Sequence, residues 1–380
     1  MTIHYDMIRS GNKTTSTSTS SMSSFNIQQR VLPSSSYYSY LLFFQFRSST
    51  WLGLGSILLL IAFSALFLYN NNINNSPFDQ PFCDPDGTCH EAPDQGTPRT
   101  VYSTWNKEQF DGWWKFYEVL NEHAEVYANK RQAMYERGNT TALRSRPLIL
   151  LGDSITESWS GTGMGIPKQR AAGSHVLKEE LSGSAGLDPI VLAISGDQTQ
   201  HLLYRLQHGH MRAAQLLRKN KNDIVYDPDA IFVVMIGTNN LGAGELPGPT
   251  TLGILAVVRY ILEQTVNAGC HVIIFEVLPR GDGKTWSHLS SNESFLPTIR
   301  TVNEGLRDGV HQLNDRYAGS RIQLIDCGTA FLNPNHYDNG DGDDSSEVKK
   351  TLMPDLLHPN QEGHKVLAKC IRTYTDHIDQ

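Results

Sequence analysis

The chain has 380 residues, 39% of them hydrophobic, and a formal net charge of −7. This charge argues against a general nucleic-acid-binding protein, and five cysteines are too few for a disulfide-rich scaffold. The charge is uneven, because residues 1–50 carry a net +3 and the rest of the chain therefore sums to −10. We interpret the sequence as one folded domain behind a long N-terminal tether.

The tether begins with a polar, low-complexity tract. Apart from Met22, every residue from Thr14 to Ser24 is Ser or Thr, and such a tract buries too little apolar surface to fold. We therefore predict a disordered tail over residues 1–48. Residues 71–100 are rich in Asn, Asp, Pro and Gly, which predicts a stem. Cys83 and Cys89 flank a short loop within it and could pair in an oxidising compartment.

Between tail and stem, Trp51 to Tyr69 forms a run of 19 residues without a charge. As a helix this run would be about 28 Å long, close to the thickness of the hydrocarbon core of a bilayer. A buried core helix would show a polar face, and a cleavable signal peptide would have a shorter apolar run near the N-terminus. We therefore predict an uncleaved signal anchor over residues 49–70.

The flanks of this run predict its orientation. Arg47 precedes it, whereas acidic residues, among them Asp79, Asp84, Asp86 and Glu91, follow it before the first basic residue, Arg99. The positive-inside rule then places the N-terminus in the cytosol and the domain in the lumen or outside the cell. The chain is expected to be a single-pass type II membrane protein of the secretory pathway or cell surface, with glycosylation sequons at Asn139 and Asn292.

Residues 101–380 carry the pattern of an α/β domain. It opens with a long amphipathic helix over residues 101–138, whose aromatic residues we assign to the core. Five short apolar runs then alternate with helical segments, which predicts right-handed βαβ units around one five-stranded parallel sheet. The runs are Leu148–Leu151, Ile190–Ile194, Ala230–Ile236, His271–Val277 and Arg321–Ile325. The helical segments are His201–Leu217, Leu252–Val266, Leu296–Leu313 and Gln361–Ile371.

Three further features of this domain receive simple interpretations. Cys270, Cys327 and Cys370 lie in apolar settings and are expected to be buried thiols. The acidic segment Asp338–Glu347 lacks the spacing of an EF-hand loop and is assigned to solvent. His201, His208, His210 and His364 lack metal-ligand spacing supported by Cys or carboxylates, so we expect no metal site.

Polar residues with catalytic chemistry follow the apolar runs. Gly152-Asp153-Ser154 ends the first run and places Ser154 in the first turn of a helix, where free N–H groups favour a developing anion. A serine hydroxyl is a weak nucleophile until a base takes its proton, and His358 near the C-terminus can serve as that base. Asp355, three residues earlier, can fix the tautomer of the histidine.

These residues stand in a pattern that resembles the SGNH family of GDSL esterases and lipases. The matching blocks, in family order, are Gly152-Asp153-Ser154, Gly196-Asp197, Gly237-Thr238-Asn239-Asn240 and Asp355-Leu356-Leu357-His358. Finer features are similar to the catalytic subunits of type I platelet-activating-factor acetylhydrolase. They are Gly196 to His201, Tyr204-Arg205-Leu206, Leu278-Pro279-Arg280-Gly281, Asn303 to Leu306 and Leu357-His358-Pro359. The resemblance covers roughly residues 140–375 and excludes the tail, the span and the stem.

The resemblance implies a three-layer α/β/α sandwich of flavodoxin-like form and a set of roles. Ser154 would be the nucleophile and His358 the base, oriented by Asp355. The backbone N–H groups of Ser154 and Gly196 and the side-chain amide of Asn239 would form the oxyanion hole. No cofactor is implied.

Three charged residues near these blocks have weaker assignments. Asp153 and Asp197 are expected to support loops rather than to transfer protons. Arg280 could line the acyl or leaving-group side of a substrate site, or could form a structural salt bridge.

The leading hypothesis is a membrane-anchored serine esterase that acts on a short acyl, in particular acetyl, ester of a lipid or another small molecule. The alternative enzyme is a glycan O-acetylesterase or O-acyltransferase of the secretory pathway. A non-catalytic binding module on the same fold is the third reading, and the intact set of blocks argues against it. The expected partners are the ester substrate and a membrane but not nucleic acid, and the oligomeric state, including a homodimer, stays open.

Overall fold

The computed structural model describes residues 91–100, 107–137, 145–183, 186–217, 224–281, 294–317, 321–333 and 348–378. The tail, the span Trp51–Tyr69, the Cys83–Cys89 pair, both sequons and the acidic segment Asp338–Glu347 lie outside these ranges. Within these ranges, no helix combines the length and the apolar character needed to cross a membrane. The anchor concerns other residues and stays a prediction.

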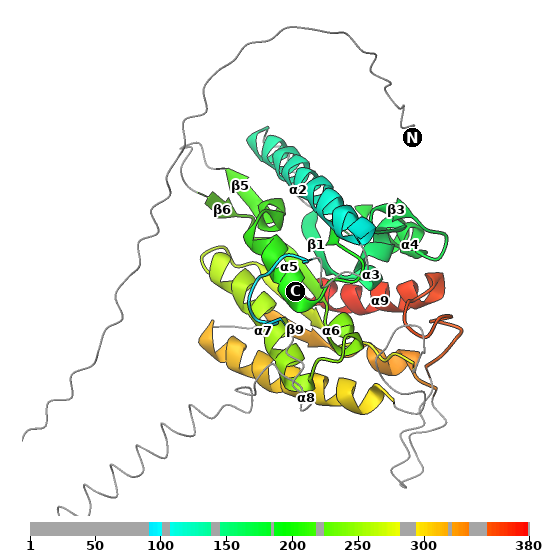
Figure 1. Cartoon of the computed structure of the whole chain (residues 1–380). Coiled ribbons are helices and arrows are strands. Elements are labelled where there is room, and N and C mark those ends of the chain that lie inside the picture. Colours follow the sequence, from blue (N-terminus) through cyan, green and yellow to red (C-terminus); the bar gives the residue numbers. More distant parts are fainter. Residues whose placement is uncertain are drawn as a thin grey trace, which may run out of the picture. The chain divides into compact units, whose positions relative to one another are not determined.

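The domain is built on a five-stranded parallel sheet with the strand order β4-β1-β7-β8-β9. Its strands are β1 (Arg146–Gly152), β4 (Leu187–Ala193), β7 (Ile231–Met235), β8 (His271–Phe275) and β9 (Ile322–Ile325). Figure 1 labels β1 and the edge strand β9. Each of the five predicted apolar runs contributes one strand. Strands β1 and β7 are almost wholly buried, as expected for a parallel sheet covered on both faces.

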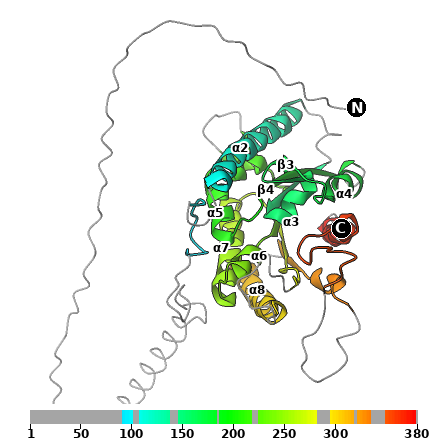
Figure 2. The same ribbon diagram turned by 45° about the vertical axis from the view of Figure 1, so that its right-hand side comes forward.

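Helices cover both faces of the sheet and complete three layers (Figure 2). One layer contains α2 (Lys107–Glu136), α5 (Thr199–Gln207), α7 (Pro247–Gln264) and α8 (Leu296–Arg316). The opposite layer contains α4 (Gly173–Glu180) and α9 (Gln361–Ile378). Alternate residues of each strand point to opposite faces, so Ile149 packs in the first hydrophobic core and Leu148 in the second. The predicted three-layer architecture is confirmed.

Shorter elements lie at the strand ends and edges of this frame. They are α3 (Ser154–Glu157), α6 (Thr238–Gly242), the 3-10 helices Ser158–Ser160, His210–Ala214 and Gly328–Phe331, and the two-stranded pairs β2 (Thr162–Gly163) with β3 (Ile166–Pro167) and β5 (Gln215–Leu217) with β6 (Ile224–Tyr226).

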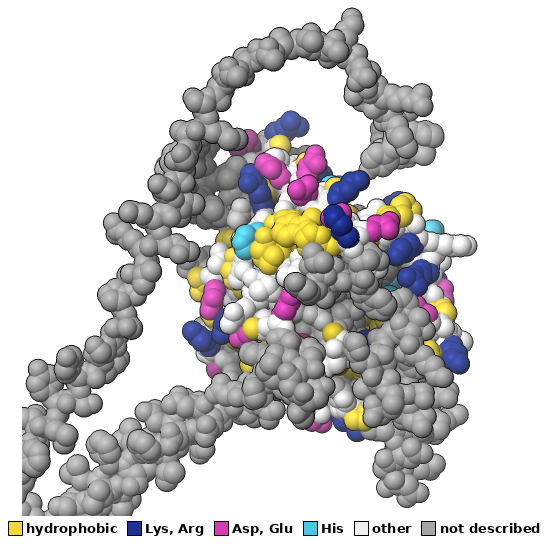
Figure 3. Space-filling view, in the orientation of Figure 1, with side chains coloured by type: hydrophobic (Ala, Val, Ile, Leu, Met, Phe, Trp, Pro, Cys, Tyr) yellow, Lys and Arg dark blue, Asp and Glu magenta, His cyan; other side chains and the backbone are white. Residues whose placement is uncertain are grey.

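The aromatic residues of α2 belong mainly to the core, as predicted. Trp113 is fully buried and stacks on Tyr117, with 5.5 Å between ring centroids. Trp114 is only partly buried and lies edge-on to Tyr204 of α5. On the surface of the molecule, hydrophobic side chains gather near α2 (Figure 3).

The predicted helix over His201–Leu217 is wrong in its second half. Helix α5 ends at Gln207, and a 3-10 helix and strand β5 occupy the remainder. Gly209, which follows the helix, has φ +148°, a backbone conformation that favours glycine. Helical geometry therefore cannot continue through this residue.

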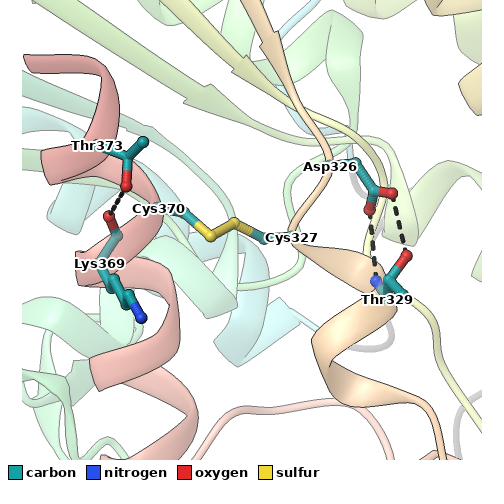
Figure 4. The surroundings of a disulfide bond; sticks show 6 residues. All are labelled: Asp326, Cys327, Thr329, Lys369, Cys370 and Thr373. Carbon is teal, nitrogen blue, oxygen red and sulfur yellow. Dashed lines mark hydrogen bonds between the residues drawn. A yellow bond between two sulfur atoms is a disulfide. The ribbon is translucent and has the colours of Figure 1, made fainter. Parts of the chain in front are cut away.

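The prediction of three buried thiols is wrong for two of them, because Cys327 and Cys370 form a disulfide (Figure 4). Cys327 follows β9 and Cys370 lies in α9, and their Cα atoms are 6.5 Å apart, within the usual range for a disulfide. The two residues are 43 positions apart, so only the packing of α9 beside the end of β9 brings them together. Cys270 is a buried thiol, as predicted, and burial raises its pKa to about 12.

Residues 91–100, which the sequence analysis assigns to the stem, pack against the domain beside α5 and α7 (Figures 1 and 2). The Thr199 hydroxyl donates to the carbonyl of Pro93 at 3.1 Å, and the Thr97 N–H donates to the carbonyl of Gln200 at 3.3 Å. Arg99 is buried, with 7% of its surface exposed. The folded unit therefore includes these ten residues.

Candidate active site

The site begins at the carboxyl end of β1, in the middle of the sheet. Gly152 ends this strand, and a Cβ at this position would lie 2.2 Å from the carbonyl oxygen of Met235, so the two strands meet too closely for a side chain. Asp153 then caps α3 by accepting the Ile155 N–H at 3.0 Å. Ser154 is the first residue of α3, in the first helical turn, as predicted.

The structure brings Ser154, His358 and Asp355 together. The Ser154 Oγ and His358 Nε2 atoms lie 2.9 Å apart across 204 positions of the sequence. The His358 Nδ1 and Asp355 Oδ2 atoms lie 2.8 Å apart. The histidine side chain is 14% exposed and the aspartate side chain 31% exposed, so the group lies at the surface, where a substrate can reach it.

A tight turn before α9 holds Asp355 and His358 in this arrangement. Leu356 has φ +63° within the turn, and its N–H donates to the carbonyl of Met353 at 2.9 Å. The Asp355 Oδ1 atom accepts the backbone N–H groups of Leu357 at 3.1 Å and of His358 at 2.7 Å. The same carboxylate therefore fixes both the turn and the imidazole ring.

The charge of Asp355 is stabilised by these contacts. Burial by itself raises the pKa of this carboxyl, but the hydrogen bonds from the His358 ring and from the backbone N–H groups of His358 and Leu357 outweigh it and lower the pKa to about 2. Asp355 is therefore ionised throughout the neutral range, as the partner of a histidine that gains a proton must be.

The next two blocks lie on the strands that flank β1. Gly196 follows β4 and has φ +81°, a conformation that favours glycine. Asn239 is the second residue of α6, after β7, and its side-chain amide donates to the carbonyl of Asp197 at 2.9 Å. The three predicted contributors to the oxyanion hole thus come from the carboxyl ends of three neighbouring strands.

A buried network of charges lies beneath these loops. Asp197 is fully buried and pairs with Arg205 at 2.7 Å, and it also accepts the indole N–H of Trp113 at 2.8 Å. Arg205 donates in turn to the carbonyl of Gly152 at 3.1 Å. Asp197 therefore supports the loops of two blocks, as predicted.

Asp153 is also buried, with 1% of its surface exposed. Burial raises its pKa to about 7, because the hydrogen bond from Ile155 offsets only part of the lost hydration. Near neutral pH, this carboxyl is therefore uncharged in a substantial fraction of the molecules, which limits the negative charge next to Ser154.

Arg280 lies against α6. Its Nη1 atom donates to the carbonyl of Thr238 at 2.7 Å, and its guanidinium lies 4.3 Å from the centre of the Phe295 ring. Burial lowers the pKa of Arg280 to about 10, and the charge of Asp153 opposes that shift. The side chain thus supports the segment that carries Asn239, while its predicted contact with substrate stays a prediction.

Glu157, at the end of α3, is a site residue that was not predicted from the sequence. Its side chain is fully buried and accepts from the Ser195 N–H at 2.7 Å and from the Ser195 hydroxyl at 2.6 Å. It also accepts the backbone N–H groups of Met164 at 3.0 Å and Gly165 at 2.8 Å. The available signal was an acidic residue three positions after Ser154, which by itself reads as an ordinary charge in a first helical turn.

Comparisons with known proteins show which family the chain resembles. Residues 150–366 match the model of the GDSL-like lipase/acylhydrolase family. Platelet-activating factor acetylhydrolase IB subunit alpha1 from Pongo abelii is 33% identical over 95 residues, which are 25% of this chain and 34% of that protein. Subunit alpha2 from Gallus gallus is 36% identical over 91 residues, 23% of this chain and 31% of that protein. The matches thus span about a third of the length of these curated relatives.

Solved structures also align with the chain. The crystal structure of a GDSL-like lipase from Bacteroides thetaiotaomicron aligns with a TM-score of 0.42 and 15% identity, over 66% of this chain and 99% of that one. A structure described as a putative platelet activating factor from Streptococcus pneumonia aligns with a TM-score of 0.39 and 16% identity, over 68% and 97% of the respective chains.

Proposed function

The chain belongs to the GDSL-like lipase/acylhydrolase family, and on that premise we propose that it is a hydrolase of ester bonds, a serine esterase that forms an acyl-enzyme on Ser154. The observation that carries the proposal is the chain of contacts from Ser154 Oγ to His358 Nε2 at 2.9 Å and from His358 Nδ1 to Asp355 Oδ2 at 2.8 Å. A serine, a base and an orienting carboxylate in this geometry are the components of nucleophilic acyl transfer.

In the proposed mechanism, the Ser154 Oγ atom attacks the ester carbonyl while His358 Nε2 takes the hydroxyl proton. Asp355 holds His358 in the tautomer with a proton on Nδ1 and stabilises the imidazolium that forms. His358 then returns the proton to the departing alkoxide, which leaves the acyl group on Ser154. Water, activated by the same histidine, releases the acid and restores the serine.

The negative charge on the tetrahedral intermediate is stabilised by the N–H groups of Ser154 and Gly196 and by the Asn239 amide. An amide nitrogen carries two N–H bonds. The bond from Asn239 to the carbonyl of Asp197 at 2.9 Å therefore orients the side chain, and the second N–H can serve the oxyanion. Loss of one such donor typically lowers kcat about 10²- to 10³-fold.

For the substrate, we propose a short acyl ester, in particular an acetyl ester of a lipid or another small molecule. The support is the likeness to subunits of an enzyme that is named as an acetylhydrolase, which covers about a third of those relatives. A glycan O-acetylesterase or O-acyltransferase is the alternative. Turnover of an acetylated phospholipid, an acetylated glycan and a short nitrophenyl ester by the purified chain decides between them.

We also propose that the domain faces an oxidising compartment behind a membrane anchor at residues 49–70. The Cys327–Cys370 disulfide supports the compartment, because such bonds persist mainly in secreted and luminal proteins. The uncharged run Trp51–Tyr69 supports the anchor. Sealed microsomes should protect residues 101–380 from added protease, whereas digestion of the domain in intact vesicles would contradict the orientation.

The test of the catalytic proposal is Ser154→Ala, with Ser160→Ala as the matched control on an exposed serine of the next turn. The first variant should fold with an unchanged melting temperature and lose at least about 10³-fold in kcat. The control should keep its activity. Near-normal turnover by Ser154→Ala would exclude this serine as the nucleophile.

A further inference from the structure

The segment Glu91–Thr100 lies against the domain close to the candidate active site. Of its ten residues, Gln95 alone is exposed. Glu91 accepts from the Gln200 side-chain amide at 3.2 Å and lies 3.4 Å from His201 Nε2. A Cβ on Gly253 of α7 would lie 2.8 Å from the carbonyl of Pro93, so this segment is closely packed rather than loosely tethered.

The side chain of Arg99 reaches from this segment to the loop that follows β4. Its Nη2 atom donates to the carbonyl of Ser195 at 2.6 Å and lies 3.2 Å from Asp197 Oδ1. A Cβ on Gly196 would lie 2.7 Å from the same nitrogen. The guanidinium of Arg99 therefore lies directly against the backbone of Gly196, in the space that a side chain on residue 196 would occupy.

The acceptor of this bond belongs to a specific peptide unit. The carbonyl of Ser195 and the N–H of Gly196 are two ends of one planar trans peptide and point in opposite directions. A donor that fixes the carbonyl therefore also fixes the direction of the N–H. A charged donor on the carbonyl also polarises the unit and strengthens the N–H as a donor at its other end.

The preceding peptide unit is held from another side. Glu157 accepts the Ser195 N–H at 2.7 Å and the Ser195 hydroxyl at 2.6 Å. Ser195 is thus fixed at its N–H by an anion from α3 and at its carbonyl by a cation from the N-terminal segment. The loop has little freedom to rotate about Gly196, although glycine is the residue that would otherwise permit it.

We propose that Arg99 is a positioning residue that orients the Gly196 N–H toward the oxyanion through their shared peptide unit. The inference rests on the proposed function, in which Gly196 is an oxyanion donor. It makes the segment before the catalytic domain a part of the catalytic apparatus. Displacement of residues 91–100 from α5 should then lower turnover without any change in Ser154, His358 or Asp355.

The test compares Arg99→Ala with Arg131→Ala in the full chain. Arg131 is a matched control, because it is also buried, donates to the backbone carbonyl of Ser145 at 2.6 Å and pairs with Asp227 at 2.7 Å. These contacts lie away from the catalytic triad of Ser154, His358 and Asp355. Arg99→Ala should lower kcat about 10- to 100-fold on a nitrophenyl ester with KM within twofold, because a misdirected donor affects mainly the transition state. Arg131→Ala should lower the melting temperature and leave kcat unchanged.

Two further measurements keep the result decisive. Millimolar guanidinium should restore part of the kcat of Arg99→Ala and none of that of Ser154→Ala. Arg99→Lys, which retains the charge, should fold and fall between Arg99→Ala and wild type in its affinity for a phenylboronic acid that mimics the tetrahedral intermediate.

Equal kcat for Arg99→Ala and wild type, or a change confined to KM, would overturn the inference. If Arg99→Ala gives either result while Ser154→Ala is inactive in the same assay, the inference about Arg99 fails and the proposed function stands. If Ser154→Ala is active, the proposed function fails instead.

Discussion

Replacement of Asp355 by Asn tests the geometry of the triad more finely than removal of the serine. Asp355 uses its Oδ1 atom for two backbone N–H groups, at 3.1 Å and 2.7 Å, and its Oδ2 atom for His358 Nδ1 at 2.8 Å. Asparagine has one acceptor oxygen and one NH₂ group. The two backbone donors would claim the oxygen and so turn the NH₂ group toward His358 Nδ1.

An NH₂ group in that place favours the tautomer of His358 with its proton on Nε2. That nitrogen then cannot accept the proton of Ser154, which lies 2.9 Å away. Loss of the correct tautomer lowers kcat about 10⁴-fold in enzymes with this triad, which corresponds to a barrier about 5 kcal/mol higher. We expect this loss in Asp355→Asn with little change in KM.

The assay is steady-state hydrolysis of a nitrophenyl ester, with melting temperature as the measure of folding. Asp111→Asn is the matched control, because Asp111 is exposed on α2 and pairs with Lys107 at 2.6 Å. The control should keep full activity. A folded Asp355→Asn enzyme with more than a tenth of the wild-type kcat would refute the tautomer argument.

Three further variants test other parts of the account. Asn239→Ala should lower kcat about 10²- to 10³-fold and leave KM nearly unchanged, and an effect on KM alone would remove it from the oxyanion hole. Cys327→Ala with Cys370→Ala should lower the free energy of unfolding by about 4 kcal/mol, from closure of a segment 43 residues long. A reductant should destabilise the wild type but not this variant, and equal stabilities would contradict the pairing. Asp153 has a folded pKa of about 7 against an ordinary value of 3.8, so its contribution to stability is largest at low pH and falls as the pH rises through that window. Between pH 5 and pH 8, the free energy of unfolding measured with urea should fall by about 2–3 kcal/mol more in the wild type than in Asp153→Asn. If the free energy of unfolding of the two proteins changes with pH in parallel, the raised pKa is excluded.

Sequence patterns were sufficient to place the sheet and the residues Ser154, Asp355 and His358. Runs such as Leu148–Leu151 are short, apolar and followed by Gly-Asp-Ser or similar turns, and residues at the carboxyl ends of parallel strands meet at one edge of the sheet. That rule brings Ser154 and Asn239 together without knowledge of the tertiary structure. Asp355 and His358 are close in sequence, so a single turn unites them.

Long-range partners of buried charges could not be predicted in this way. Glu157 accepts from a backbone N–H 38 positions away, and Arg99 donates to a backbone carbonyl 96 positions away. Neither a backbone donor nor a backbone acceptor leaves a mark in the sequence. Composition also misplaced Arg99, since its Pro- and Gly-containing surroundings resemble a linker. The disulfide was missed because an apolar setting around Cys327 and Cys370 is equally consistent with thiols.

The central claim is that Ser154 becomes acylated, and covalent labelling tests it most directly. A fluorophosphonate reacts with a serine that a neighbouring base activates, and it leaves a stable adduct whose position peptide mass spectrometry locates. We predict one adduct per chain, on Ser154, that appears together with loss of esterase activity and is absent from His358→Ala. An adduct on another residue, or full activity in a chain labelled at Ser154, would contradict the account.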